Sequence, residues 1–127
     1  MRYEFHPEAL AEYEEAARYY AGCQEGLELR FIASVEAAIR QVAAAPEGWR
    51  LIAQDVRRCL AKVFPYAILY TIESEYVLIL AVMHCHREPG YWRRRVGENA
   101  EHDAPPNGGP VVQPGTSGVT EGPPSVS

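Results

Sequence analysis

One stretch of the chain, from Val56 to Arg95, reads VRRCLAKVFPYAILYTIESEYVLILAVMHCHREPGYWRRR. It predicts three consecutive strands followed by a basic, aromatic end. The first predicted strand covers residues 56–64 and ends before Pro65, because proline cannot donate a hydrogen bond to a β-ladder. Residues 66–72 are rich in aromatic and β-branched side chains, and residues 76–83 are apolar throughout, which is typical of a strand buried on both faces. The short breaks between them make the strands antiparallel neighbours.

The residues before this stretch predict one strand and two helices. Arg2–Phe5 alternates polar and apolar residues, which favours an edge strand. A first helix begins at Pro7 and ends near Gly22, and a second runs from about Glu25 to Ala45. Their expected buried stripes are Leu10, Tyr13, Ala17 and Tyr20 in the first helix, and Leu27, Phe31, Val35, Ala38 or Ile39, and Val42 in the second. We therefore expect an α+β fold: a strand, an αα-hairpin, a loop through Trp49 and Leu51, and a three-stranded antiparallel meander.

The C-terminal part of the chain has a different composition. From Glu98 onward it is rich in proline and glycine and has no aromatic residue. Such a segment buries too little apolar surface to offset the entropy lost on ordering. We expect one folded domain over residues 1–97 and a disordered tail over residues 98–127.

Several protein classes are disfavoured by composition. No apolar run reaches the roughly 20 residues of a membrane-spanning helix, and acidic residues stand where a signal peptide would be apolar. The three cysteines, Cys23, Cys59 and Cys85, are widely spaced, which favours reduced and mostly buried thiols over a disulfide framework. We expect a cytoplasmic protein without a membrane partner.

Charge is distributed unevenly along the chain, whose net charge is −5. Residues 1–56 carry 5 arginines and 10 acids, residues 57–96 carry 7 basic residues and 3 acids, and residues 97–127 carry 4 acids and no Lys or Arg. A local basic face can steer an anionic partner, although Arg and Lys also solvate sheet edges.

Metal and nucleophile chemistry have weak support. In a strand, His84 and His86 would share one face, with Cys85 on the other. Two imidazoles are fewer than the three or four ligands of a zinc site, so we expect no metal. The sequence also has no Gly-x-Ser-x-Gly elbow, no marked reactive cysteine and no glycine-rich phosphate loop, and we expect no cofactor.

Basic, histidine and aromatic residues gather in the strand half of the chain. Arginines bind phosphates, histidines transfer protons near neutral pH, and aromatic rings stack on bases. These types together fit RNA cleavage or docking to a nucleic acid or a protein. The candidates are Arg57, Arg58, Lys62, His84, His86, Arg87, Tyr91, Trp92, Arg93, Arg94 and Arg95.

Several phrases in this order resemble the RelE/ParE toxins of type II toxin–antitoxin systems. They are Phe5-His6-Pro7-Glu8-Ala9, Glu14-Glu15-Ala16-Ala17-Arg18-Tyr19-Tyr20, Phe64-Pro65-Tyr66-Ala67-Ile68-Leu69-Tyr70 and His84-x-His86-Arg87-x-Pro89-Gly90-Tyr91-Trp92. The resemblance covers residues 2 to about 95. It implies a small bacterial toxin held inactive by a cognate antitoxin whose C-terminal segment wraps the helices and sheet, in a toxin–antitoxin hetero-oligomer. A strand apolar on both faces needs a second cover besides the helices, which a partner's amphipathic segment or a homodimer would supply.

The resemblance leaves the target open, because RelE-like members cut ribosome-bound mRNA and ParE-like members bind DNA gyrase. Arg58 and Lys62 resemble the basic strand residues of the ribonucleases, and Arg87 with Tyr91 resembles their C-terminal pair. Ala67 departs from the ribonuclease pattern, which has a basic residue there. The Arg-x-Pro-Gly-Tyr-Trp ending resembles the ParE-like branch and uncharacterised branches of the family.

Three hypotheses follow. The first is a non-enzymatic growth inhibitor that binds a target such as gyrase through Arg87, Tyr91, Trp92, Arg93, Arg94 and Arg95. The second is a ribosome-dependent mRNA endoribonuclease that uses Arg58, Lys62, His84, His86, Arg87 and Tyr91. The third is a degenerate toxin that only binds its antitoxin.

Overall fold

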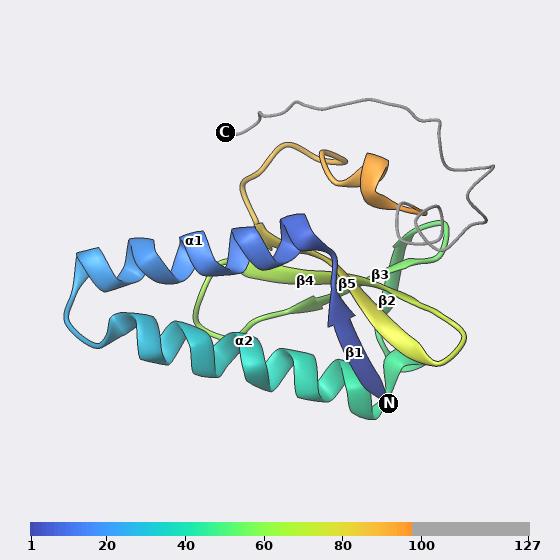
Figure 1. The fold of residues 1–127 in the computed structure, drawn as a ribbon, viewed down its shortest axis with the longest axis horizontal. Helices are drawn as coiled ribbons and strands as arrows, with labels where there is room; N and C mark the ends of the chain where they lie inside the picture. The colour runs from blue at the N-terminus through green and yellow to red at the C-terminus, as the bar shows by residue number, and fades with distance from the viewer. Residues whose placement is uncertain (98–127) are drawn as a thin grey trace. The chain divides into compact units, whose positions relative to one another are not determined.

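A computed structural model of the chain describes residues 1–97, and the expected tail over residues 98–127 lies outside them. The elements are β1 (Arg2–Phe5), α1 (Pro7–Cys23), α2 (Leu27–Ala44), the 3-10 turn η1 (Pro46–Gly48), β2 (Arg50–Ala53), β3 (Val56–Leu60), β4 (Tyr66–Ile72), β5 (Tyr76–His84) and the 3-10 turn η2 (Arg93–Arg95) (Figure 1). The predicted α+β class and element order are confirmed. Met1–Arg93 forms one compact unit.

The strands form one sheet in the order β1-β5-β4-β3-β2. The antiparallel meander β3–β4–β5 is confirmed, and β1 is an edge strand that lies parallel to β5. The sequence predicted a loop before Val56. This prediction is wrong, because residues 50–53 form a fifth strand that pairs with β3. This strand has four residues and an irregular register between Leu51 and Ala53, so it shows no clean alternation. β3 ends at Leu60, before the expected Phe64.

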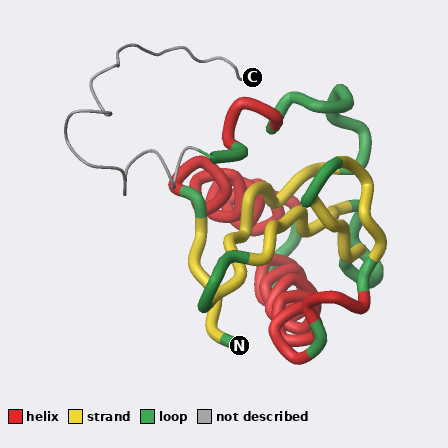
Figure 2. The backbone as a smooth tube through the Cα atoms, turned by 90° about the vertical axis from the view of Figure 1, so that its right-hand side faces the viewer, coloured by secondary structure: helices red, strands yellow, loops and turns green. Residues whose placement is uncertain are grey.

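Both helices pack on one face of the sheet (Figure 2, where they are seen roughly along their axes). The predicted stripe of α2 is confirmed at Phe31, Val35, Ala38, Ile39 and Val42, which are buried. The predicted stripe of α1 is confirmed at Tyr13, which is buried, and at Ala17 and Tyr20, which pack against the cluster. It is wrong at Leu10, which is 41% exposed, and the buried stripe instead includes Ala9 and Ala16. Alanine at two of these positions lets α1 approach the sheet closely. Gly22 lies inside α1, which ends one residue later.

The opposite face of the sheet carries a second apolar cluster. Its buried members are Val56, Ala67, Leu69, Leu78, Leu80, Ala81 and Trp92. β5 contributes to both clusters, which confirms that it is buried on both faces. The expectation that a partner supplies the second cover is corrected in part, because Trp92 comes from the chain itself and follows β5.

Candidate functional site

A turn after β5 brings the side chains of His84 and His86 close together. The amide of His86 donates to Nδ1 of His84 at 3.0 Å, and the amide of Arg87 donates to the carbonyl of His84 at 2.9 Å. β5 therefore ends at His84, and the two rings lie 5.1 Å apart through this turn and not through strand alternation. Within residues 1–97, no group of three or more His, Cys, Asp or Glu side chains gathers as a metal site would require.

Glu12 of α1 holds the segment after β5 against the sheet. Just after β1, the amide of His6 donates to the carbonyl of Ile79 in β5, at 2.9 Å. Farther along this edge, the amide of Val82 donates to Oε1 of Glu12 at 3.0 Å. The hydroxyl of Tyr91 donates to Oε2 of the same carboxylate at 2.8 Å. One carboxylate thus satisfies a strand amide and fixes the C-terminal segment.

Sequence reasoning missed Glu12. The residue directly precedes Tyr13, a buried position of α1, and is itself only half-buried. A carboxylate beside the sheet-facing stripe of a helix can accept a hydrogen bond from a strand amide that has no strand partner. This position is the sequence signal that would have identified Glu12.

Two exposed arginines stack on the aromatic residues of this segment. The guanidinium carbon of Arg87 lies 3.8 Å from the Tyr91 ring centroid, and that of Arg93 lies 5.1 Å from the Trp92 ring centroid. Gly90 adopts φ +80°, and a Cβ there would lie 2.7 Å from Nε of Arg93. A side chain at position 90 would therefore displace Arg93.

The six predicted target-binding residues do not form one exposed surface. Arg87, Arg93 and Arg94 are exposed and Tyr91 is half-buried, whereas Trp92 and Arg95 are each only 4% exposed. Trp92 is corrected from a docking residue to part of the apolar cluster, because its ring covers the second face of the sheet. Within the unit Met1–Arg93, the accessible part of the predicted surface is Arg87, Arg93 and the half-buried Tyr91.

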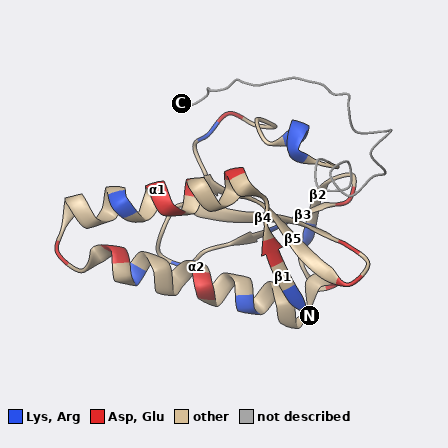
Figure 3. Ribbon diagram, in the orientation of Figure 1, with Lys and Arg blue, Asp and Glu red and all other residues tan. Residues whose placement is uncertain are grey.

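The predicted ribonuclease residues do not all come together: His84 lies beside His86 and Arg87 beside Tyr91, whereas Arg58 lies apart from the histidines. Arg58 pairs in register with Leu69, which places it on the face of the Trp92 cluster. His84 pairs with Tyr66, whose ring packs against the helix-face cluster, so His84 belongs to the other face. Figure 3 shows Lys and Arg on both helices and on the segment after β5. Ala67 is fully buried in the Trp92 cluster, where a basic side chain would be desolvated.

Neighbouring strand arginines also differ in their surroundings. Arg57 faces the helix side and donates to the carbonyls of Glu47 and Trp49, at 3.2 and 2.7 Å. Arg58 lies opposite Arg50 in the register, and neither forms an ion pair with any residue of the described chain. Arg57 therefore stabilises the turn before β2, whereas Arg58 and Arg50 together form a small positive area on the sheet.

Burial shifts the pKa values of several groups on the helix face. Desolvation, followed by nearby Tyr20, Tyr19, Glu12 and Glu15, raises the pKa of Tyr66 to about 12. Desolvation also raises the pKa of the Cys59 thiol to about 11, so this thiol is neutral and unreactive at neutral pH. All three cysteines are free, but Cys23 and Cys85 are exposed, which corrects the expectation of mostly buried thiols.

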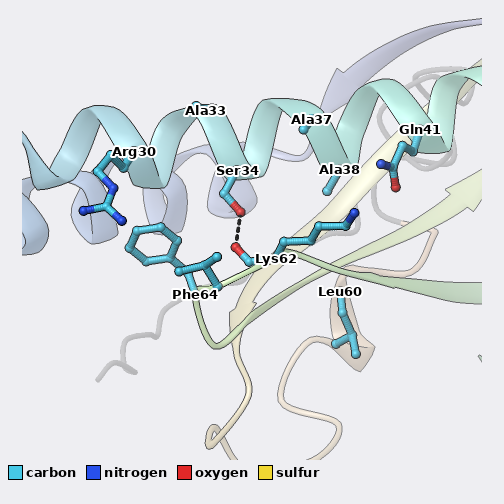
Figure 4. A pocket seen from close by; sticks show the side chains of 10 residues that line it. Arg30, Ala33, Ser34, Ala37, Ala38, Gln41, Leu60, Lys62 and Phe64 are labelled. Atoms are coloured by element: carbon cyan, nitrogen blue, oxygen red, sulfur yellow. Dashed lines mark hydrogen bonds between the residues drawn. The ribbon is translucent and has the colours of Figure 1, made fainter.

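A hollow of about 300 Å³ lies between α2 and the loop that joins β3 to β4 (Figure 4). Its lining residues are Arg30, Ala33, Ser34, Ala37, Ala38, Gln41, Leu60, Lys62, Val63 and Phe64. The hydroxyl of Ser34 donates to the carbonyl of Lys62 at 2.6 Å and so ties the loop to the helix. The predicted Lys62 therefore lies at this hollow.

No helix within residues 1–97 is long and apolar enough to cross a membrane. The fold is that of a small α+β domain with a helical hairpin on one face of a five-stranded sheet, and it is similar to the structure titled "Chromosomal ParDE TA system from P. aeruginosa". The TM-score is 0.57 at 15% sequence identity, over 66% of this chain and 95% of that one. No curated protein sequence matches the chain.

Residues 3–89 match the model of the family described as the ParE toxin of the type II toxin–antitoxin system, parDE. The chain belongs to this ParE toxin family, which confirms the RelE/ParE-type assignment made from the sequence.

Proposed function

We propose that this chain is a growth-inhibiting toxin that acts in the cytoplasm by binding a protein target, with DNA gyrase as the first candidate. The exposed Arg87 and Arg93, together with the half-buried Tyr91, would contact the target. An antitoxin encoded beside the toxin would bind it and neutralise it in a hetero-oligomer. Membership of the ParE toxin family supports the toxin role.

The separation of the predicted ribonuclease residues is the observation that favours binding over catalysis. General acid–base cleavage needs its proton-transfer groups and phosphate ligands around one scissile bond. Arg58 and His84 lie on opposite faces of the sheet. The cluster of exposed Arg and Tyr after β5 needs no such convergence to bind a protein.

The test uses the purified full chain and purified gyrase. We expect inhibition of supercoiling or trapping of gyrase–DNA cleavage complexes at micromolar toxin. Arg87→Ala should weaken the effect, because it removes an exposed guanidinium from the segment. Arg40→Ala, an exposed arginine of α2 outside this segment, is the matched control and should keep full activity.

Unchanged supercoiling and cleavage at these concentrations would show that gyrase is not the target. New mRNA 5′ ends in ribosome complexes, abolished by Arg87→Ala, would replace the proposal with the endoribonuclease function. Tight antitoxin binding without any effect on growth would indicate a degenerate toxin.

A further inference from the structure

A carboxylate of α1 takes the place of a strand partner along one edge of β5. The register of β1 with β5 ends where Phe5 lies opposite Ile79. Three residues farther along β5, the amide of Val82 donates to Oε1 of Glu12 at 3.0 Å. Val82 is only 2% exposed, so its amide would lose a hydrogen bond in a buried position without this acceptor. The sheet therefore fixes where the Glu12 carboxylate lies.

The second oxygen of this carboxylate fixes the ring of Tyr91. The phenol hydroxyl donates to Oε2 of Glu12 at 2.8 Å, and hydrogen bonds to a charged acceptor are stronger than those between neutral groups. The Tyr91 ring also packs against the apolar cluster that contains Trp92. A phenol held both at its ring and at its hydroxyl keeps one rotamer.

The Tyr91 ring in turn supports Arg87. The guanidinium carbon of Arg87 lies 3.8 Å from the ring centroid, which is the geometry of a cation–π stack. Arg87 is exposed and forms no ion pair within the described residues. The stack uses the face of the guanidinium, and the N–H donors in its plane can still bind a carboxylate or a carbonyl of a target.

An arginine that is oriented before it binds should bind its target more tightly. A free arginine side chain samples many rotamers, and immobilising it on binding costs free energy. Stacking on a fixed ring removes part of this cost at Arg87, which corresponds to about three- to tenfold in affinity. Arg93 provides a comparison within the same segment, because it stacks on Trp92, whose position depends on burial in the apolar cluster and not on Glu12.

We propose that Glu12 is a positioning residue of the target-binding site. It acts through Tyr91 to hold Arg87 in the orientation that binds the target. The proposal rests on the proposed function for the identity of that target. Because Glu12 acts only through Arg87, its substitution should weaken target binding only while Arg87 is present.

The first measurement follows the Arg87 side chain of the full chain by NMR. Protons above an aromatic ring are shifted upfield by the ring current, so the Arg87 Nε–H and side-chain methylene protons should resonate upfield of a free arginine. Glu12→Ala should move them toward the free value and leave the Arg93 signals in place. Glu14→Ala removes an exposed acid of the same helix and is the matched control, which should leave both arginines unchanged.

The second measurement is a double-variant cycle on inhibition of gyrase. We expect Arg87→Ala to raise the toxin concentration for half-inhibition about tenfold, and Glu12→Ala to raise it about three- to tenfold. The variant with both substitutions should be no weaker than Arg87→Ala alone, because the two side chains act as one unit. Two independent structural effects would instead multiply.

Glu12→Gln and Tyr91→Phe separate positioning from folding. The glutamine carbonyl can accept from the Val82 amide while its NH₂ group donates to the Tyr91 oxygen, so Glu12→Gln should inhibit within about twofold of the unchanged chain. Tyr91→Phe keeps the ring but loses the link to Glu12, so it should resemble Glu12→Ala. Thermal unfolding of each variant ensures that inhibition is compared between folded chains.

Three results would each overturn the proposal. They are Arg87 signals that stay upfield in Glu12→Ala, inhibition by Glu12→Ala as strong as by Glu14→Ala, and losses from Glu12→Ala and Arg87→Ala that multiply. An unchanged chain without effect on gyrase would instead reject the proposed target. The NMR measurement needs no target, and the same cycle measured on growth arrest would then decide the role of Glu12. Failure of the positioning role is therefore distinguishable from failure of the proposed function.

Discussion

The two faces of the sheet are covered in different ways. One face lies under α1 and α2, helices of 17 and 18 residues, with a continuous buried cluster between helices and strands. The other face receives Trp92 from the segment after β5, and Glu12 holds that segment through Tyr91. The helical cover consists of two long helices, whereas the C-terminal cover is a short segment that follows β5. Short irregular segments open at lower free energy than long packed helices, and the proposed target-binding residues lie on such a segment.

Truncation of a buried side chain under the two helices should cause a large loss of stability. Phe31 is fully buried and contacts the rings of Tyr13, Tyr20, Phe64 and Tyr66. We expect Phe31→Ala to lower the free energy of unfolding by about 3–5 kcal/mol because of the cavity it leaves. Urea unfolding followed by circular dichroism would measure this, and a loss below about 1 kcal/mol would contradict the assigned core.

Trp92→Ala should have a smaller and more local effect. We expect a loss of about 2–3 kcal/mol, because the segment can detach while the sheet and helices stay packed. Growth inhibition should be lost, since Arg87 and Arg93 would no longer be held in place. Trp49→Ala is the control, because Trp49 packs on the helix-face cluster. Equal loss of growth inhibition in both variants at matched expression would argue against a special role for the C-terminal cover.

Glu12 and Tyr91 allow a finer test of that cover. We expect Tyr91→Phe to lower the free energy of unfolding by about 1 kcal/mol, since it removes a partly exposed hydrogen bond to a carboxylate. Glu12→Ala should also speed hydrogen exchange at the Val82 amide, because it removes the carboxylate that accepts from this amide. The double variant should cost less than the sum of the two single variants. Fully additive effects would mean that the two side chains do not interact in solution.

High pH should weaken the helix face. Desolvation is the largest cause that raises the pKa of Tyr70 to about 12 from the ordinary value of 10.0, and the same holds for Tyr66. The folded chain then keeps these protons where the unfolded chain loses them. Stability is therefore full below pH 10 and falls as the pH rises from about 10 toward 12. Unfolding measured across this window should show the fall, and Tyr70→Phe should reduce its slope. A flat profile would contradict the burial of these phenols.

The helix face was predictable from the sequence, and the opposite face was not. The apolar stripe of α2 and the apolar run of β5 are strong periodic signals, and both are confirmed. β2 has four residues and an irregular register, too short for alternation to show. The bond between Tyr91 and Glu12 joins residues 79 positions apart, and Trp92 is buried against residues of three different strands. No local pattern in the sequence predicts such contacts. For the same reason, the sequence suggested one basic cluster, whereas the sheet separates Arg58 from His84.

Pulse labelling after induction of the chain without antitoxin tests the central claim most directly. DNA and protein synthesis are followed side by side from the moment of induction. Binding to gyrase predicts that DNA synthesis falls first, with a DNA-damage response, and that Arg87→Ala delays the fall. If protein synthesis stops first and DNA synthesis follows, the chain acts on translation and the proposed target is wrong.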